Sequence, residues 1–276
     1  MRDTVGRLLR SPFGATGLAL FGALLLTALL APLIATQDPI ALVPRDALQG
    51  PSAAHLFGTD DLGRDVFSRV IWGSRLAVRL GVLSVLIAAS GGVVLGLLAG
   101  YYGGWVDNLI SRVLEVVLAF PGILFAIAIV AILGPSLDNL IVALGLFGWP
   151  GYARLVRGSV LSAKHREYVE AARAIGATGR RIMARHLLPN VVAPVIILSA
   201  TRFGGALLAG SGLSFIGLGV PIPQPEWGAI MATGRDYLDS AWWVFAFPGG
   251  IIAVAVLGVN LLGDGLRDVL DPRLRT

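Results

Sequence analysis

One polar, basic stretch of the sequence, residues 162–190, carries the residue types best suited to binding another protein. It contains Glu170-Ala171-Ala172, then Gly176, and after nine intervening residues His186-Leu187-Leu188-Pro189. A helical glutamate offers a carboxylate for a charge-assisted hydrogen bond, and the adjacent alanines leave a nearly flat face. The helix formers stop at Gly176, which suits the left-handed conformation that ends many helices. The pattern predicts two short helices that form a docking surface, and the alternative is a solvated basic loop.

Two charged residues fall within segments that are otherwise apolar and long enough to cross a membrane. Such residues are candidates for a functional site by default. Arg202 needs an acidic partner, a water-filled cavity or a carboxylate from a ligand, and the alternative is a structural ion pair with another helix. Glu115 lies three residues after Arg112, so its alternative role is an ion pair within one helical turn.

Several kinds of chemistry are excluded by the residues that the chain lacks. Cysteine is absent, and the three histidines lie outside the apolar segments. A phosphate-binding loop needs Gly-Lys-Ser/Thr, but the single lysine sits in Ala163-Lys164-His165. The acidic cluster Asp60-Asp61 with Asp65 lacks the spacing of a calcium-binding loop. We therefore expect no metal site, no bound cofactor and no enzymatic activity in this chain.

The composition shows which elements must position these residues. Of 276 residues, 55% are hydrophobic and 14% are charged, and the mean hydropathy is +0.78. A soluble domain carries about 25% charged residues. Since a membrane-spanning helix needs about 20 mainly apolar residues, we predict an all-α polytopic membrane protein with six transmembrane helices. Their approximate positions are 17–35, 80–100, 110–133, 140–154, 191–213 and 244–262.

The distribution of basic residues predicts the orientation of the chain. With both termini in the cytoplasm, 15 of the 22 Lys and Arg residues lie inside and 6 outside, as the positive-inside rule requires. The net charge of +5 thus reflects topology and does not indicate nucleic-acid binding. The outer segments are then 36–79 and 214–243. We expect an amphipathic helix over 66–75 at the outer interface, capped by Thr59 or Asp60.

The pattern of residues 170–172, 176 and 186–189 resembles the EAA loop of ABC importer permeases. The His-Leu-Leu-Pro variant is similar to the peptide/nickel branch. Further blocks, over about residues 10–275, resemble the C-type permease subunit of dipeptide/oligopeptide/nickel importers. These blocks are Phe57-Gly58-Thr59-Asp60, Gly63-Arg64-Asp65, Gly100-Tyr101-Tyr102-Gly103-Gly104, Ala119-Phe120-Pro121, Leu213-Ser214-Phe215-Ile216-Gly217-Leu218-Gly219, and Gly263-Asp264-Gly265-Leu266-Arg267-Asp268 with Asp271-Pro272-Arg273.

The resemblance implies a type I ABC importer permease fold in a bacterial or archaeal inner membrane. Residues 1–75 would carry the first helix and an outer loop, 76–265 the permease core with its coupling loop at 162–190, and 266–276 a cytoplasmic tail. The coupling loop would seat in an ATPase subunit. Arg202 and Glu115 would be candidates for the translocation path.

The resemblance also implies partners. These are a B-type sister permease, two cytoplasmic ATPase subunits that use ATP and Mg, and an extracytoplasmic solute-binding protein docked on the outer loops. The expected cargo is a di- or oligopeptide, and the alternatives are nickel or another small solute. A secondary transporter is less favoured, because the sequence shows no internal repeat and only Glu115 as an acid within the predicted spans.

Overall fold

The structure is a computed structural model that describes residues 2–270, with side chains from residue 6 onward. Within this range it contains helices and a single isolated bridge between Thr59 and Asp65, and no strand. The helices are α1 (Arg2–Arg10), α2 (Pro12–Ile34), α3 (Val66–Tyr102), α4 (Gly104–Leu118), α5 (Gly122–Leu133), α6 (Leu137–Ala163), α7 (Glu167–Ala174), α8 (Gly179–Ile182), α9 (Leu188–Phe215), α10 (Trp227–Gly234) and α11 (Trp243–Leu270). Three short turns are η1 (Pro44–Asp46), η2 (Met183–Leu187) and η3 (Arg235–Tyr237).

The number of membrane-spanning helices is only partly as predicted. Four helices are long and apolar enough to cross a membrane: α2, α3, the continuous helix Gly179–Phe215 and α11. A fifth span results if α4 and α5, which are bent by 84° at their junction, count as one. The prediction of one span over 110–133 therefore needs correction. Helix α4 stops before Pro121, whose extended ψ of 128° redirects the chain into α5.

The long helix α3 replaces the interfacial helix predicted over 66–75. Asp65, and neither Thr59 nor Asp60, is its N-cap, and its side chain accepts a hydrogen bond from the Ser68 amide at 2.8 Å. No proline interrupts the following 37 residues, so the helix continues through the apolar segment. Its first turns are buried, with Val66 0% and Arg69 2% exposed, because the outer loops cover them.

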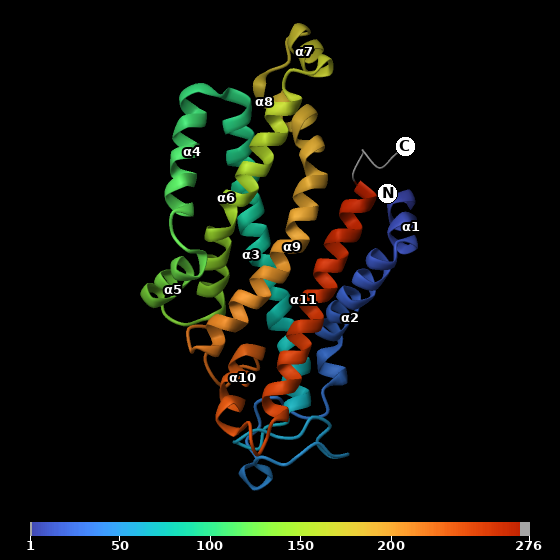
Figure 1. Ribbon diagram of the computed structural model, residues 1–276, viewed down its shortest axis with the longest axis vertical. Coiled ribbons are helices and arrows are strands. Elements are labelled where there is room, and N and C mark those ends of the chain that lie inside the picture. Colours follow the sequence, from blue (N-terminus) through green and yellow to red (C-terminus); the bar gives the residue numbers. More distant parts are fainter. Residues whose placement is uncertain (1, 271–276) are drawn as a thin grey trace.

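Glycines spaced four residues apart allow α3 and α6 to lie in close contact along their length. A Cβ atom on Gly92, Gly96 or Gly100 would lie 2.4–2.7 Å from side-chain atoms of Tyr152, Val156 and Val160 respectively. Small residues at this spacing are a common way for membrane helices to approach each other. The two helices form the most extensive contact between elements in the described chain, and they cross the bundle together (Figure 1).

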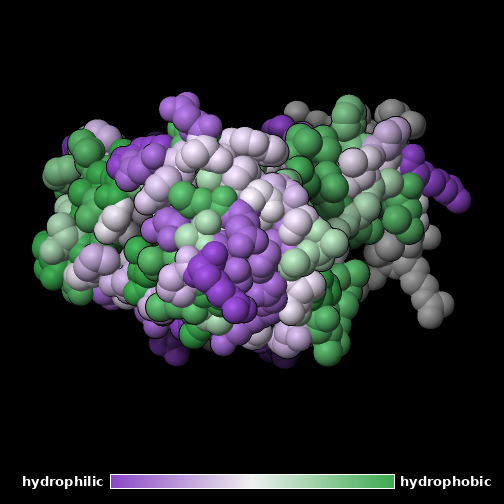
Figure 2. Space-filling view, turned by 90° about the horizontal axis from the view of Figure 1, so that it is seen from below, coloured by the Kyte–Doolittle hydropathy of each residue, from purple (hydrophilic) through white to green (hydrophobic). Residues whose placement is uncertain are grey.

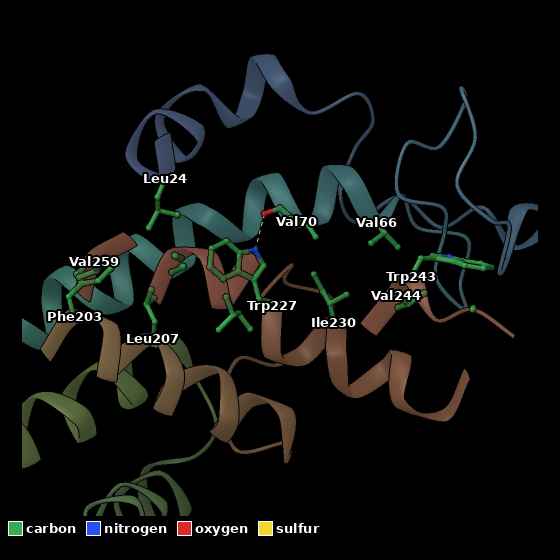
Figure 3. Packing of buried hydrophobic residues seen from close by; sticks show 14 residues of the cluster. Leu24, Val66, Val70, Phe203, Leu207, Trp227, Ile230, Trp243, Val244 and Val259 are labelled. Carbon is green, nitrogen blue, oxygen red and sulfur yellow. Dashed lines mark hydrogen bonds between the residues drawn. The ribbon is translucent and has the colours of Figure 1, made fainter. Parts of the chain in front are cut away.

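The largest apolar cluster joins five helices around Trp227 of α10. The indole of Trp227 is 1% exposed and donates a hydrogen bond to the Val70 carbonyl of α3 at 2.9 Å. Figure 3 shows this bond together with the apolar side chains that α2, α9 and α11 direct at the same region. The cluster holds the outer loops against the bundle.

The bundle has two different ends (Figure 1). Residues 164–187, which include α7 and α8, project beyond the helices at one end, and we call them the knob. Residues 36–65 and 216–242, which include α10, cover the other end, and we call them the cap. The start of α1 and the end of α11 lie nearer to the knob than to the cap.

Candidate functional site

Helix α7 of the knob ends as the sequence predicts. Gly176 has φ +82°, its amide donates to the Arg173 carbonyl at 2.9 Å, and the Ala177 amide donates to the Ala172 carbonyl at 3.0 Å. This pair of bonds is the Schellman arrangement, which needs a residue that tolerates positive φ. Thr178 then caps α8 by accepting from the Arg181 amide. The chain therefore reverses sharply between the two short helices.

The side chains of α7 are divided between a buried and an exposed face. Val169 and Ala172 are 0% and 4% exposed and pack with Ile182 of α8 and Leu187. Glu170 and Ala171 are exposed, and the Glu170 carboxylate forms no hydrogen bond or ion pair with any described residue. Ala172 therefore belongs to the internal packing of the knob, so the flat outer face consists of fewer alanines than expected.

Polar contacts attach the knob to the bundle. The Asn190 amide nitrogen donates to the Tyr168 hydroxyl at 3.1 Å and to the His186 carbonyl at 2.6 Å. Lys164 donates to the Gly100 carbonyl at 3.1 Å, and the Arg173 guanidinium lies 5.6 Å from the centre of the Tyr101 ring. These contacts hold the base of the knob and leave its tip without a described partner.

The knob continues into α9 through the π-helical turn η2. His186 lies in this turn, and Leu188 and Pro189 form the start of α9. The chain passes from η2 into α9 without a break, because Pro189 occupies a first-turn position where its missing amide hydrogen is tolerated. Short π-helical turns are frequent at functional sites.

The cap contains a cluster of buried charges that the sequence did not reveal. Asp60 is 1% exposed, and its carboxylate lies 2.7 Å from Nε of Arg64 and 3.6 Å from Nε of Arg69. Both arginines are 2% exposed, and Arg69 also donates to the Pro39 carbonyl at 2.9 Å. Burial, together with the charge of Asp60, raises the pKa of Asp61. Five charged residues within ten positions, 60–69, were the available signal, but their burial depends on the fold.

Further buried polar contacts connect the cap to α3, α9 and α11. His55 Nδ1 lies 3.1 Å from Asp65, and the Trp243 indole donates to the Thr59 carbonyl at 3.0 Å. Glu226 accepts from Ser211 at 3.1 Å. Burial raises the pKa of Glu226, although hydrogen bonds from backbone amides oppose the shift. On the outward face of the cap, hydrophilic residues gather at the centre between hydrophobic flanks (Figure 2).

The two charged candidates in the apolar segments lie in different settings. Glu115 is exposed and forms an ion pair with Arg112 at 3.0 Å, as the alternative interpretation predicts. Arg202 lines a cavity of about 210 Å³ between α3, α5, α6 and α9. Sequence reasoning missed the ion pair of Asp107 with Arg157, at 2.6 Å between Oδ2 and Nη2, which joins α4 to α6.

The described residues, 2–270, contain no group of three or more His, Asp or Glu side chains that could hold a metal ion. Of the buried acidic residues of the cap, Asp60 is paired with Arg64 and accepts from the Arg64 backbone amide, and Asp65 lies beside His55.

Sequence comparisons identify relatives over the whole chain. Residues 92–276 match the family described as binding-protein-dependent transport system inner membrane component, and residues 1–51 match the N-terminal TM domain of oligopeptide transport permease C. The dipeptide transport system permease protein DppC of Alkalihalophilus pseudofirmus is 45% identical over 275 residues, which cover 100% of this chain and 90% of that protein. The glutathione transport system permease protein GsiD of Pectobacterium atrosepticum is 47% identical over 228 residues, which cover 83% of this chain and 76% of that protein.

The fold also has a counterpart among solved structures. A chain of the inward-facing MetNI methionine ABC transporter is similar with a TM-score of 0.56 and 20% identity. The similarity covers 75% of this chain and 97% of that chain, so it supports the arrangement of the helices.

Proposed function

The chain belongs to the family of binding-protein-dependent transport system inner membrane components, and on this basis we propose that it is the permease subunit of an ATP-driven peptide importer. Its relatives include permeases named for dipeptides, for di- and tripeptides and for glutathione. Peptides are therefore the cargo that these names favour, and a nickel importer is not favoured.

The exposed tip of the knob is the observation that carries this proposal. Helix α7 presents Glu170 and Ala171 on its exposed side, and Ile175 is 86% exposed at its end. An unpaired carboxylate beside an exposed apolar side chain suits a protein cleft that supplies a basic residue and an apolar pocket. We propose that this cleft belongs to a cytoplasmic ATPase subunit, and that the second ATPase binds the sister permease.

The remaining assignments follow from placing the knob in the cytoplasm. Both termini then lie on the cytoplasmic side, and the cap faces outward, where a solute-binding protein docks on its hydrophilic centre. The B-type sister permease completes the translocation path, to which this chain contributes Arg202. Glu115 lies at the flank of that path, since Arg112 already neutralises it. ATP and Mg bind the partner subunits, because this chain has no phosphate-binding loop.

A charge reversal in α7 tests the proposal. Glu170→Lys should abolish ATP-dependent dipeptide uptake and reduce copurification of the ATPase subunits, while the permease still inserts in the membrane. Glu167→Lys is the matched control, because Glu167 is an exposed glutamate in the same helix.

The control variant should retain both uptake and ATPase binding. Equal loss in the two variants would show that α7 tolerates no added positive charge, and would count against a specific role of Glu170. Dipeptide uptake that persists in cells without any ABC ATPase would contradict the proposed function as a whole.

A further inference from the structure

Arg202 is a charged residue halfway along α9 with no partner in the described chain. It lies 14 residues after Leu188 and 13 before Phe215, the two ends of the helix. Its side chain is exposed and forms no hydrogen bond or ion pair with residues 2–270. An arginine at the centre of a membrane helix is energetically unfavourable unless its charge is compensated. Such a residue requires an anion or water near its guanidinium.

Three acidic residues of α4 and α6 do not supply this anion, because each is already paired with another arginine. Asp107 is bound to Arg157, Glu115 to Arg112 and Asp138 to Arg79. No described carboxylate lies within 4.0 Å of the Arg202 guanidinium. The side chain instead runs beside Gly151 of α6, where a Cβ atom would be only 2.6 Å from Nη2. Glycine at this position therefore leaves the guanidinium its space.

The cavity beside Arg202 has room for a small ligand. Its walls combine small residues with one aromatic ring, and they include Ser84, Ala88, Gly122, Phe147, Gly148 and Gly205. The walls expose mainly apolar atoms, so the guanidinium is the single full charge among the lining residues. Apolar walls with one convergent charged group are typical of ligand sites, and the charged group fixes the ligand's orientation.

We propose that this cavity is a carboxylate subsite in which Arg202 binds the terminal carboxylate of a peptide during its passage. The planar guanidinium forms two parallel hydrogen bonds with a carboxylate, and these are stronger than neutral ones. Lipid phosphate is not favoured as the anion, because Arg202 lies far from both ends of α9. This inference rests on the proposed peptide importer and specifies how its path recognises the cargo.

Paired substrates test the subsite directly. Uptake of a dipeptide with a free carboxylate is compared with uptake of its C-terminal amide in the assembled importer, at saturating loaded binding protein for each. Loss of one hydrogen-bonded charge pair should make uptake of the amide about 10- to 100-fold weaker than uptake of the free acid. The wild-type importer should prefer the free acid more strongly than the binding protein alone does. Arg202→Gln should reduce the ratio of acid uptake to amide uptake to about 1.

Two further variants test separately the guanidinium of Arg202 and the open space of the cavity. Arg202→Lys retains the charge without the two parallel bonds, so it should assemble normally and show an intermediate ratio. Gly205→Leu should slow uptake of both substrates, because a Cβ at Gly205 has no heavy atom within 4 Å and the side chain can enter the cavity. Arg10→Gln, an exposed arginine in α1, is the control and should leave the ratio unchanged.

The outcomes distinguish the inference from the function on which it rests. An unchanged acid-to-amide ratio in both Arg202 variants, with peptide uptake intact, overturns the subsite and indicates an acidic partner on the sister permease. Unaffected uptake in Gly205→Leu overturns the assignment of the cavity. Absence of ATP-dependent uptake of any peptide by the wild type would instead contradict the proposed function.

Discussion

The cap and the knob use charged residues in opposite ways. Where the cap meets α3, Asp60 and Arg64 of the cap and Arg69 of α3 are at most 2% exposed and lie close together. In the knob, Glu170 and Arg181 are exposed, and neither side chain pairs with a described residue. Buried charges must be neutralised within the fold, whereas exposed charges contribute little to stability. The cap charges thus serve folding, and the knob charges are free to bind a partner.

The largest effect should follow from breaking the charge cluster of the cap. Asp60→Asn leaves the buried guanidinium of Arg64 without its main counter-ion, which destabilises a protein by about 3–5 kcal/mol. The midpoint of thermal unfolding of the purified importer should fall, and the yield of folded permease should drop. Asp239→Asn, at an exposed acid of the cap, should change stability by less than about 0.5 kcal/mol. Equal effects would show that burial does not distinguish the two acids.

A smaller effect is expected where the cap meets α3. Trp227→Phe removes the hydrogen bond to the Val70 carbonyl and leaves a space in the apolar cluster. The combined loss should be about 2 kcal/mol. Trp242→Phe provides the comparison, because Trp242 is 53% exposed and should tolerate the change. The same thermal unfolding assay measures both variants. An unchanged unfolding midpoint in Trp227→Phe would show that the indole hydrogen bond does not stabilise the protein.

In the knob, the backbone turn should matter more than any side chain. Gly176→Ala places a Cβ at φ +82°, which costs about 1 kcal/mol. The effect should remain local. Hydrogen–deuterium exchange should rise about fivefold over residues 170–180 and stay constant in the cap. Gly158→Ala, in a helical position with open space around it, should not raise exchange. A rise that spreads to the cap would mean that the two regions unfold together.

The smallest effect on folding should come from the exposed tip. Ile175→Ala should change stability by less than about 0.5 kcal/mol, since Ile175 is 86% exposed. Its loss should still weaken ATPase binding by about 1–2 kcal/mol, as expected of an apolar anchor at an interface. Titration of purified ATPase subunits into permease reconstituted in nanodiscs measures the affinity. Unchanged affinity would place the contact surface elsewhere on the knob.

Local sequence signals predicted the end of α7 in the knob and one ion pair in α4. Gly176 ends α7, and Arg112 pairs with Glu115, each through residues within four positions of one another. The all-helical fold also followed from composition. These features depend on neighbouring residues, so they can be recognised without knowledge of the tertiary structure.

The cap and the cavity could not be predicted in the same way. Asp60 and Arg69 are nine residues apart, and whether they meet in solvent or in the interior depends on loops that cover α3. The cavity beside Arg202 arises where α3, α5, α6 and α9 come together. The 84° bend between α4 and α5 was not predicted, because a proline marks a break but not its angle.

The π-helical turn η2 has a mechanical consequence. It makes α8 and α9 one continuous rod, Gly179–Phe215, of 37 residues. At 1.5 Å per residue, Arg202 lies about 35 Å along this rod from Gly179. A rotation applied at the knob would therefore turn the guanidinium about the same axis. The proposed ATPase contact and the proposed cargo contact thus lie on a single stretch of backbone, so motion at one end needs no relay of side chains to reach the other.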